Sequence, residues 1–162
     1  MQKESFYISK NGIGIEFCIE GSFISSISLK PAKTDFFPSV KSDSFSELIK
    51  MLSFYLDGKN VDFSLYLDKL FWQKCSSFQK KVYEALSKVK FGQYISYEEL
   101  AKTACSGNYA RAVGNAMSRN PFPLIIPCHR VLPKSFPMTK KLGGFSCGLE
   151  LKEKLLMIEK IL

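Results

Sequence analysis

The amino-acid sequence predicts an α/β domain over residues 1–72, followed by a mainly helical domain over residues 73–162. Apolar residues in the first part alternate with a period of two, as in half-buried strands, before helical spacing takes over. The second part holds four helical patterns separated by turns and loops. With 162 residues, 46% of them apolar, the chain can fill one ordinary core or two small ones.

The first domain is expected to begin with a β-hairpin. Apolar side chains alternate over residues 13–19 and again over residues 23–29. The Glu-Gly-Ser sequence at 20–22 between them is typical of a turn. Both runs therefore present an apolar face to the same core.

A helix and a further strand are expected to complete this domain. After a loop over residues 31–42, Ser44 and Glu47 have the spacing of a capping box and predict that a helix follows. Helical spacing continues up to Gly58, which can take the left-handed conformation at a helix end. Residues 61–67 alternate again and predict a strand. We therefore expect a small sheet covered by one helix.

The second domain is expected to open with two helices. A polar connection leads to residues 78–89, where the apolar positions fall on one helical face that ends near Gly92. Ser96 and Glu99 form a second capping-box pattern, which predicts a short helix through Lys102.

A third helix is expected over residues 109–118, after a turn at 106–108. Two short helices joined by such a turn fit either a helix-turn-helix or an ordinary helical hairpin. Charge favours the first: residues 1–72 carry a net charge of −1, whereas residues 73–162 carry +9, which suits a polyanionic partner such as DNA. The small residues of the third helix could lie close to DNA or pack in the core, and Arg111 is the long cation of its first turn.

Cys128 follows a short apolar run and precedes His129, the only histidine of the chain. It could be a buried hydrophobe, a metal ligand, a redox thiol or a nucleophile. The five cysteines form no C-x-x-C pair, which argues against a disulfide framework and a redox couple, and no zinc ligand set is recognisable. We expect no metal and no cofactor.

A nucleophilic role requires a base that produces the thiolate. His129, with Glu159 of a C-terminal amphipathic helix behind it, could supply that base. Neighbouring side chains on an extended segment point to opposite faces, so we expect a bridging water or a local turn rather than a direct bond from Cys128 to His129. Transfer of an alkyl group to sulfur asks less of the surroundings than hydrolysis, which needs an oxyanion hole.

Several motifs of residues 72–162 resemble those of the O6-alkylguanine-DNA alkyltransferases, in the same order and at near-family spacing. They are Phe78-Gln79 with Val82, Ser96-Tyr97 with Leu100-Ala101, Ala110-Arg111-Ala112-Val113-Gly114 with Ala116, Asn120-Pro121, Ile126-Pro127-Cys128-His129-Arg130-Val131, and Gly144-Phe145-Ser146 with Lys152, Leu155-Leu156 and Glu159. The resemblance implies an RNase H-like first domain, a winged helix-turn-helix second domain, and single-turnover repair of alkylated guanine by a monomer. It also implies that duplex DNA is bound in the minor groove and that the damaged base is flipped out.

The resemblance further implies a role for individual residues. Cys128 would accept the alkyl group, and His129, oriented by Glu159, would take the thiol proton through a water. Tyr97 would protonate the guanine and help turn its phosphate, and Asn120 would brace the turn and the active-site hydrogen bonds. Arg111 would fill the space that the base vacates, as intercalating side chains do. The expected DNA contacts also include Tyr97, Ala110, Gly114 and Arg130, and the expected pocket residues are Met117, Val131, Phe145 and Ser146.

The chain departs from the family pattern in three places. The loop over residues 132–142 is longer than usual, Cys147-Gly148 replaces a Gly-Gly pair, and the zinc ligands found in some members have no counterpart. Three other classes share some of these features: a lesion-binding module without transfer, which would lack the acceptor cysteine, a winged-helix regulator with a structural cysteine, and a cysteine hydrolase. The sequence shows no signal peptide and no membrane span, and we expect a cytoplasmic protein.

Overall fold

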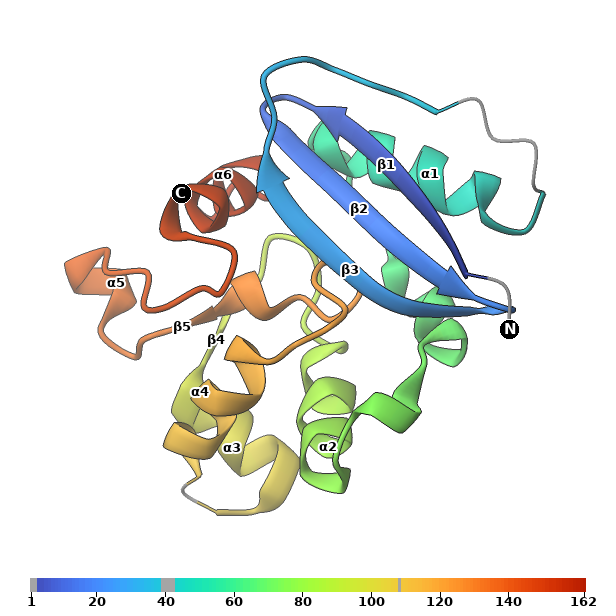
Figure 1. The fold of residues 1–162 in the computed structure, drawn as a ribbon. Coiled ribbons are helices and arrows are strands. Elements are labelled where there is room, and N and C mark those ends of the chain that lie inside the picture. The colour runs from blue at the N-terminus through green and yellow to red at the C-terminus, as the bar shows by residue number, and fades with distance from the viewer. Residues whose placement is uncertain (1–2, 39–42, 108) are drawn as a thin grey trace.

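Alternating apolar residues build a three-stranded antiparallel sheet in the computed structural model, which describes residues 3–38, 43–107 and 109–162. The strands are β1 (Lys3–Lys10), β2 (Ile13–Glu20) and β3 (Phe23–Pro31), in the order β1-β2-β3 (Figure 1). The predicted hairpin is confirmed as β2 and β3, in which Ile15 lies opposite Leu29. Strand β1 was not predicted, because few of its residues are apolar and only its second half is buried.

Helix α1 (Asp43–Leu56) lies against one face of this sheet (Figure 1). The helix that the sequence predicts after residue 44 is confirmed and begins at Asp43, whereas the side chain of Ser44, the predicted cap, lies outside what the structure describes. The predicted end is confirmed, since Gly58 follows with a φ of 74°.

The strand predicted over residues 61–67 is wrong, because this segment forms the 3₁₀ helix η1 (Phe63–Lys69). The side chain of Asp62 accepts a hydrogen bond from the backbone N–H of Ser64 and starts this turn. Phe63 is buried but Leu65 is 76% exposed, so the alternating pattern does not mark one buried face. A second 3₁₀ helix, η2 (Trp72–Lys74), follows in the predicted polar connection.

Three helices form the end of the molecule away from the sheet (Figure 1): α2 (Ser77–Leu86), α3 (Tyr97–Cys105) and α4 (Ala110–Ser118). The capping box of Ser96 and Glu99 is confirmed, and a second one, formed by Ser76 and Gln79, opens α2. Helix α3 continues three residues beyond the predicted end and stops where Ser106 takes the left-handed conformation. Asn108, part of the predicted turn, lies outside the described residues.

The chain after α4 carries short elements between irregular segments. The 3₁₀ helix η3 (Cys128–Arg130) leads into β5 (Val131–Leu132), which pairs in parallel with β4 (Ile95–Ser96). The predicted loop after it contains a short helix, α5 (Phe136–Thr139), because Phe136 packs against Leu132 and Leu156. Helix α6 (Leu149–Ile158) ends the fold and stops just before Glu159, which was expected on the helix.

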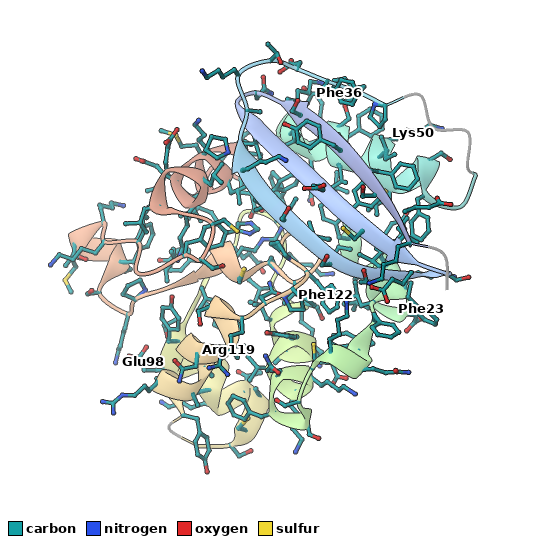
Figure 2. The ribbon with its side chains drawn as sticks, viewed as in Figure 1. Phe23, Phe36, Lys50, Glu98, Arg119 and Phe122 are labelled. Atoms are coloured by element: carbon teal, nitrogen blue, oxygen red, sulfur yellow. The ribbon has the colours of Figure 1, made fainter. Side chains whose placement is uncertain are left out.

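A continuous apolar core joins the two halves of the chain. Phe122 is fully buried (labelled in Figure 2) and its ring lies 6.1 Å from that of Trp72. The backbone N–H of Ile27 in β3 donates to the carbonyl of Pro121 at 2.7 Å. The sheet therefore packs directly on the segment that leads to Cys128. In the described ranges, no helix is both long and apolar enough to cross a membrane.

Candidate active site

Cys128 lies at the inner end of a pocket between α4 and the loop before α6. Its side chain is almost completely buried, with 4% of the residue exposed. Burial raises the pKa of the thiol to about 11, although a hydrogen bond from Asn120 acts in the opposite direction. The resting side chain is therefore a neutral thiol at neutral pH, and it needs a base in order to react as a thiolate.

Asn120, which follows α4, makes three hydrogen bonds around this cysteine. Its Nδ2 donates to the carbonyl of Ile126 at 2.8 Å and to Sγ of Cys128 at 3.1 Å. Its Oδ1 accepts from the backbone N–H of Phe122 at 3.0 Å. The side chain thus closes the turn over residues 120–126 and holds the sulfur against it.

The reaction pocket, as we call this cavity of about 390 Å³, is mostly apolar in its lining. Its walls are formed by Tyr97, Gly114, Met117, Ser118, Cys128, Gly144, Phe145 and Ser146. Three predicted pocket residues, Met117, Phe145 and Ser146, are among them. Val131 is not, because it is fully buried behind the pocket as part of β5. Burial and the nearby Cys128 raise the pKa of Tyr97, so its phenol stays protonated and can donate a proton inside the pocket.

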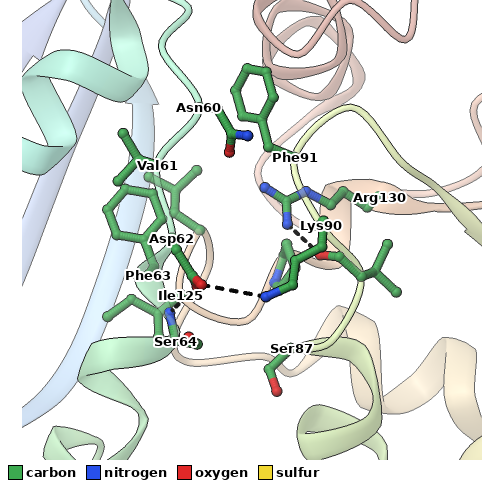
Figure 3. A pocket seen from close by; sticks show the side chains of 13 residues that line it. Asn60, Val61, Asp62, Phe63, Ser64, Ser87, Lys90, Phe91, Ile125 and Arg130 are labelled. Carbon is green, nitrogen blue, oxygen red and sulfur yellow. Dashed lines mark hydrogen bonds and ion pairs between the residues drawn. The ribbon is translucent and has the colours of Figure 1, made fainter.

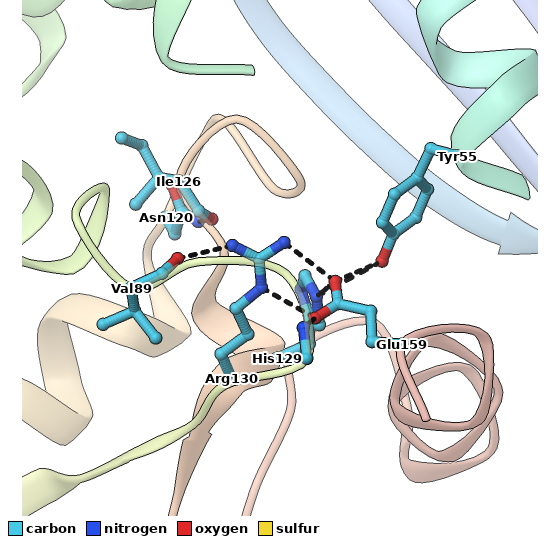
Figure 4. A network of polar contacts seen from close by, with 8 residues as sticks. Tyr55, Val89, Asn120, Ile126, His129, Arg130 and Glu159 are labelled. Carbon is cyan, nitrogen blue, oxygen red and sulfur yellow. Dashed lines mark hydrogen bonds and ion pairs between the residues drawn. The ribbon is translucent and has the colours of Figure 1, made fainter. Parts of the chain in front are cut away.

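His129 contacts Glu159, whose Oε1 lies 2.7 Å from Nε2 of the imidazole (Figure 4). A proton on Nε2 makes this bond, and the other nitrogen, Nδ1, then carries the lone pair. Nδ1 is buried and has no hydrogen-bond partner among the residues that the structure describes. Burial lowers the pKa of His129 despite the opposing effect of Glu159, so the imidazole is a neutral acceptor at neutral pH. Among the described residues, Cys128 and His129 share no direct hydrogen bond, and the 3₁₀ turn η3 supplies the local turn that the sequence predicted.

Arg130 holds the same carboxylate in a fork. Its Nε donates to Oε2 of Glu159 at 2.8 Å, its Nη2 to Oε1 at 2.9 Å, and its Nη1 to the carbonyl of Val89 at 2.6 Å. Burial alone would raise the pKa of Glu159, but the bonds and charges of His129 and Arg130 lower it to about 2. Arg130 is 5% exposed, so its surroundings do not favour the contact with DNA that the sequence predicted.

Two buried residues beside the site received no role from the sequence. One is Tyr55 of α1, whose hydroxyl donates to Oε1 of Glu159 at 2.8 Å. A tyrosine among apolar core positions needs a hydrogen-bond partner, and this was the available signal. We call Tyr55, His129, Arg130 and Glu159 the polar network.

The second residue, Lys152, carries part of the family resemblance but was given no role there, and it is fully buried on α6. Its ammonium donates to the carbonyls of Val131, Leu142 and Gly144 at 2.8, 2.7 and 3.1 Å. Burial lowers its pKa to about 8, and the three acceptors favour the charged form at neutral pH. Lys152 therefore fixes the loop that carries Phe145 against the strand that follows Cys128.

Helix α4 presents small side chains beside the reaction pocket. Arg111 is exposed in its first turn, as is Arg119 just beyond its end (Figure 2). Gly114 lines the pocket, and a Cβ placed there would meet no atom within 4 Å, so the space above this part of the helix is open. Ala110 lies on the same helix and is half-buried. This surface can accept a partner that approaches the helix backbone closely.

A separate cavity of about 230 Å³ lies between η1 and the segments 87–91 and 124–130 (Figure 3). An ion pair between Lys90 and Asp62 crosses it at 3.3 Å, and Arg130 forms part of its wall. The cavity does not include Cys128 in its lining. Within the described ranges, no three His, Cys, Asp or Glu side chains gather as a metal site would require.

Comparisons with known proteins identify relatives of this chain. The family model described as "6-O-methylguanine DNA methyltransferase, DNA binding domain" matches residues 77–161. The methylated-DNA–protein-cysteine methyltransferase of Metallosphaera sedula is 42% identical over 120 residues, which cover 74% of this chain and 70% of the relative. That of Mycobacterium leprae is 36% identical over 132 residues, covering 81% and 73%.

Solved structures are similar over nearly the whole chain. The crystal structure of Mycobacterium tuberculosis O6-methylguanine methyltransferase has a TM-score of 0.72 at 28% identity and covers 99% of this chain and 94% of that one. The structure of the M. tuberculosis protein in complex with DNA has a TM-score of 0.70 at 27% identity, covering 97% and 93%.

Proposed function

The chain belongs to the O6-methylguanine DNA methyltransferase family, and on this basis we propose that it repairs O6-alkylguanine in double-stranded DNA by transferring the alkyl group to Cys128. The observation that carries this proposal is the thiol at the inner end of an apolar pocket, backed by a buried His129–Glu159 pair. Such a pocket accommodates the flat faces of an aromatic nucleobase. His129, in the same turn as Cys128, can accept the thiol proton.

In the transfer, Sγ of Cys128 attacks the alkyl carbon, so that a carbon–sulfur bond forms as the carbon–oxygen bond breaks. The electron pair of the broken bond stays on O6, and Tyr97 donates a proton to the departing guanine. The thiol proton passes through a water to Nδ1 of His129, the buried nitrogen for which the described part of the chain offers no hydrogen-bond partner. Thiol, base and proton donor balance this reaction, so the proposal needs no cofactor or metal.

Each protein is consumed by one transfer under this proposal. A thioether is stable to hydrolysis, and no step returns the thiol to its free form. The alkyl group then stays on Cys128, inside the reaction pocket, and prevents a second attack.

We place the DNA on the exposed surface of α4. The net charge of +9 in residues 73–162 suits a polyanion, and the open space at Gly114 lets the helix approach the minor groove. Arg111 would enter the duplex and replace the flipped base. In this proposal residues 1–72 are an RNase H-like domain, residues 73–162 are a winged helix-turn-helix domain built on α3 and α4, and the protein acts as a monomer in the cytoplasm.

A lesion-binding module without transfer is the second candidate. It shares the pocket and α4 with the first, but it gives no role to the thiol of Cys128 or to the buried pair behind it. The presence of both favours transfer.

The test is to incubate the protein with duplex DNA that contains O6-methylguanine and to measure its intact mass. We expect the gain of a single methyl group, mapped to Cys128 and absent from Cys128→Ala. Cys147→Ala is the matched control, because it removes another half-buried thiol next to Ser146 of the pocket lining. A protein that binds the lesion without gaining mass would support the lesion-binding module instead of transfer. More than one transfer per protein molecule would contradict the proposal that each protein is consumed by one transfer.

A further inference from the structure

Tyr55 brings helix α1 into contact with the residues behind the reactive thiol. Its side chain is fully buried, and its hydroxyl lies 2.8 Å from Oε1 of Glu159 and 3.3 Å from Nε2 of His129. The rings of Phe63, Phe91 and His129 surround it, with centroids at 5.6, 6.1 and 6.5 Å. The phenol therefore has one fixed position from which to donate its proton.

The carboxylate of Glu159 is held from two sides (Figure 4). Arg130 and the backbone N–H of Gly92 donate to it from the C-terminal half, at 2.8 to 3.3 Å. Tyr55 contacts it from α1 and is the member of the polar network that comes from the N-terminal half of the chain. The oxygen that it contacts, Oε1, is the one that accepts from His129.

From this arrangement we infer that Tyr55 is a positioning residue for the His129–Glu159 pair, through which the N-terminal half takes part in the transfer reaction. The inference rests on the proposed function. By donating to Oε1, the phenol fixes the carboxylate and draws part of its negative charge away from the imidazole. The imidazole is thereby held with Nε2 on the carboxylate and the lone pair on Nδ1, and its basicity is moderated.

The phenol can serve as a donor over the whole working pH range. Burial raises its pKa well above 10, and the negative charge of Glu159 raises it further. The other charged or titratable groups that act on His129 are Arg130 from η3 and Lys152 from α6, both of which lower its pKa. These cations are unchanged when the hydroxyl of Tyr55 is removed, so the effect of the phenol can be isolated.

A role in folding alone is the competing explanation, and the structure offers a way to separate the two. The end of α1 is held by other contacts, including Nδ2 of Asn11 on the carbonyl of Leu56 at 2.8 Å and an ion pair between Lys10 and Asp57. Tyr55→Phe removes only the hydroxyl and keeps the ring in its aromatic surroundings. Tyr83→Phe is the matched control, because Tyr83 is also fully buried and donates to a backbone carbonyl, that of Ala116, at 2.8 Å.

The experiment is an NMR titration of His129 in the full-length protein, which is unambiguous because the chain has one histidine. Without the phenol, Glu159 holds the imidazolium more strongly, so we expect the pKa of His129 to rise in Tyr55→Phe and to stay unchanged in Tyr83→Phe. An unchanged pKa in Tyr55→Phe would overturn the inference. This measurement uses no substrate, so its outcome is independent of whether the protein transfers alkyl groups.

Kinetics supply the second measurement. The single-turnover rate of methyl transfer, followed from about pH 5 to 9, should fall by about tenfold in Tyr55→Phe at neutral pH. The acid limb of the profile should move to higher pH, because more of His129 is protonated there. A profile that overlays that of Tyr83→Phe would show that the hydroxyl only stabilises the fold. Loss of transfer in the unmodified protein would instead contradict the proposed function.

Discussion

Nδ2 of Asn120 lies 3.1 Å from Sγ of Cys128, and the same nitrogen donates to the carbonyl of Ile126 at 2.8 Å. One amide group thus shapes the turn and supplies the sulfur with a donor. A donor of this kind stabilises the thiolate more than the thiol, which offsets part of the cost of burying the charge.

Substitution of Asn120 should therefore slow the transfer step, while the lining of the reaction pocket, to which Asn120 does not belong, stays intact. We expect a loss of about tenfold for Asn120→Ala and a larger loss for Asn120→Asp, whose carboxylate places a negative charge beside the sulfur. The single-turnover rate on O6-methylguanine in duplex DNA measures both. Asn60→Ala, at an exposed position, is the control, and equal rates for all variants would contradict the role of the amide.

Arg130 should contribute to stability rather than to DNA affinity. Arg130→Met leaves Glu159 buried without its bidentate partner, and we expect a loss of about 3–5 kcal/mol in the free energy of unfolding. Urea denaturation measures this loss. If Arg130→Met kept normal stability but bound DNA more weakly, the structural role would be contradicted and the predicted contact between Arg130 and DNA would be supported.

Arg111 should matter only when the substrate is part of a duplex. Because it is exposed on α4, outside the pocket lining, Arg111→Ala should slow repair of duplex DNA more than reaction with the free base O6-methylguanine. Arg119→Ala removes a nearby exposed cation and should reduce DNA affinity without this difference between substrates. Equal losses of Arg111→Ala on both substrates would remove its proposed part in base flipping.

The polar network predicts a loss of stability in acid. The folded-state pKa values of His129 and Glu159 lie below their ordinary values of 6.5 and 4.5, that of Glu159 at about 2. The unfolded chain therefore binds more protons, and the stability present above pH 6.5 is lost as the pH falls toward 2. Glu159 alone accounts for about 3 kcal/mol of this change.

The urea midpoint as a function of pH measures this effect. Glu159→Gln should be less stable than the unmodified protein at neutral pH, because Arg130 loses its charged partner, but its stability should depend less on pH below 4.5. Parallel curves for the two proteins in this range would assign the acid sensitivity to other groups.

Local patterns of the sequence determined much of the fold. The hairpin of β2 and β3 follows from alternation over a few neighbouring residues, and the start of α3 follows from Ser96 and Glu99, three positions apart. The family resemblance also singled out Cys128, His129 and Glu159, which the structure brings to the pocket and the polar network. Alternation alone failed at residues 61–67, where a short-range hydrogen bond from Ser64 to Asp62 starts a 3₁₀ helix instead.

Only the tertiary structure decided which side chains complete the site. Tyr55 donates a hydrogen bond to Glu159, which lies 104 positions later in the sequence. Arg130, which was expected to contact DNA, instead binds the carboxylate of Glu159, 29 positions later. Val131, which was expected to line the pocket, is buried in β5 and is not part of the lining. Helix caps and strand alternation depend on backbone geometry over a few residues, so the sequence displays them directly. The partner of a buried polar group depends on how distant segments pack. A buried polar group without a hydrogen bond is costly, but the residue that supplies the bond is brought near only when the core forms.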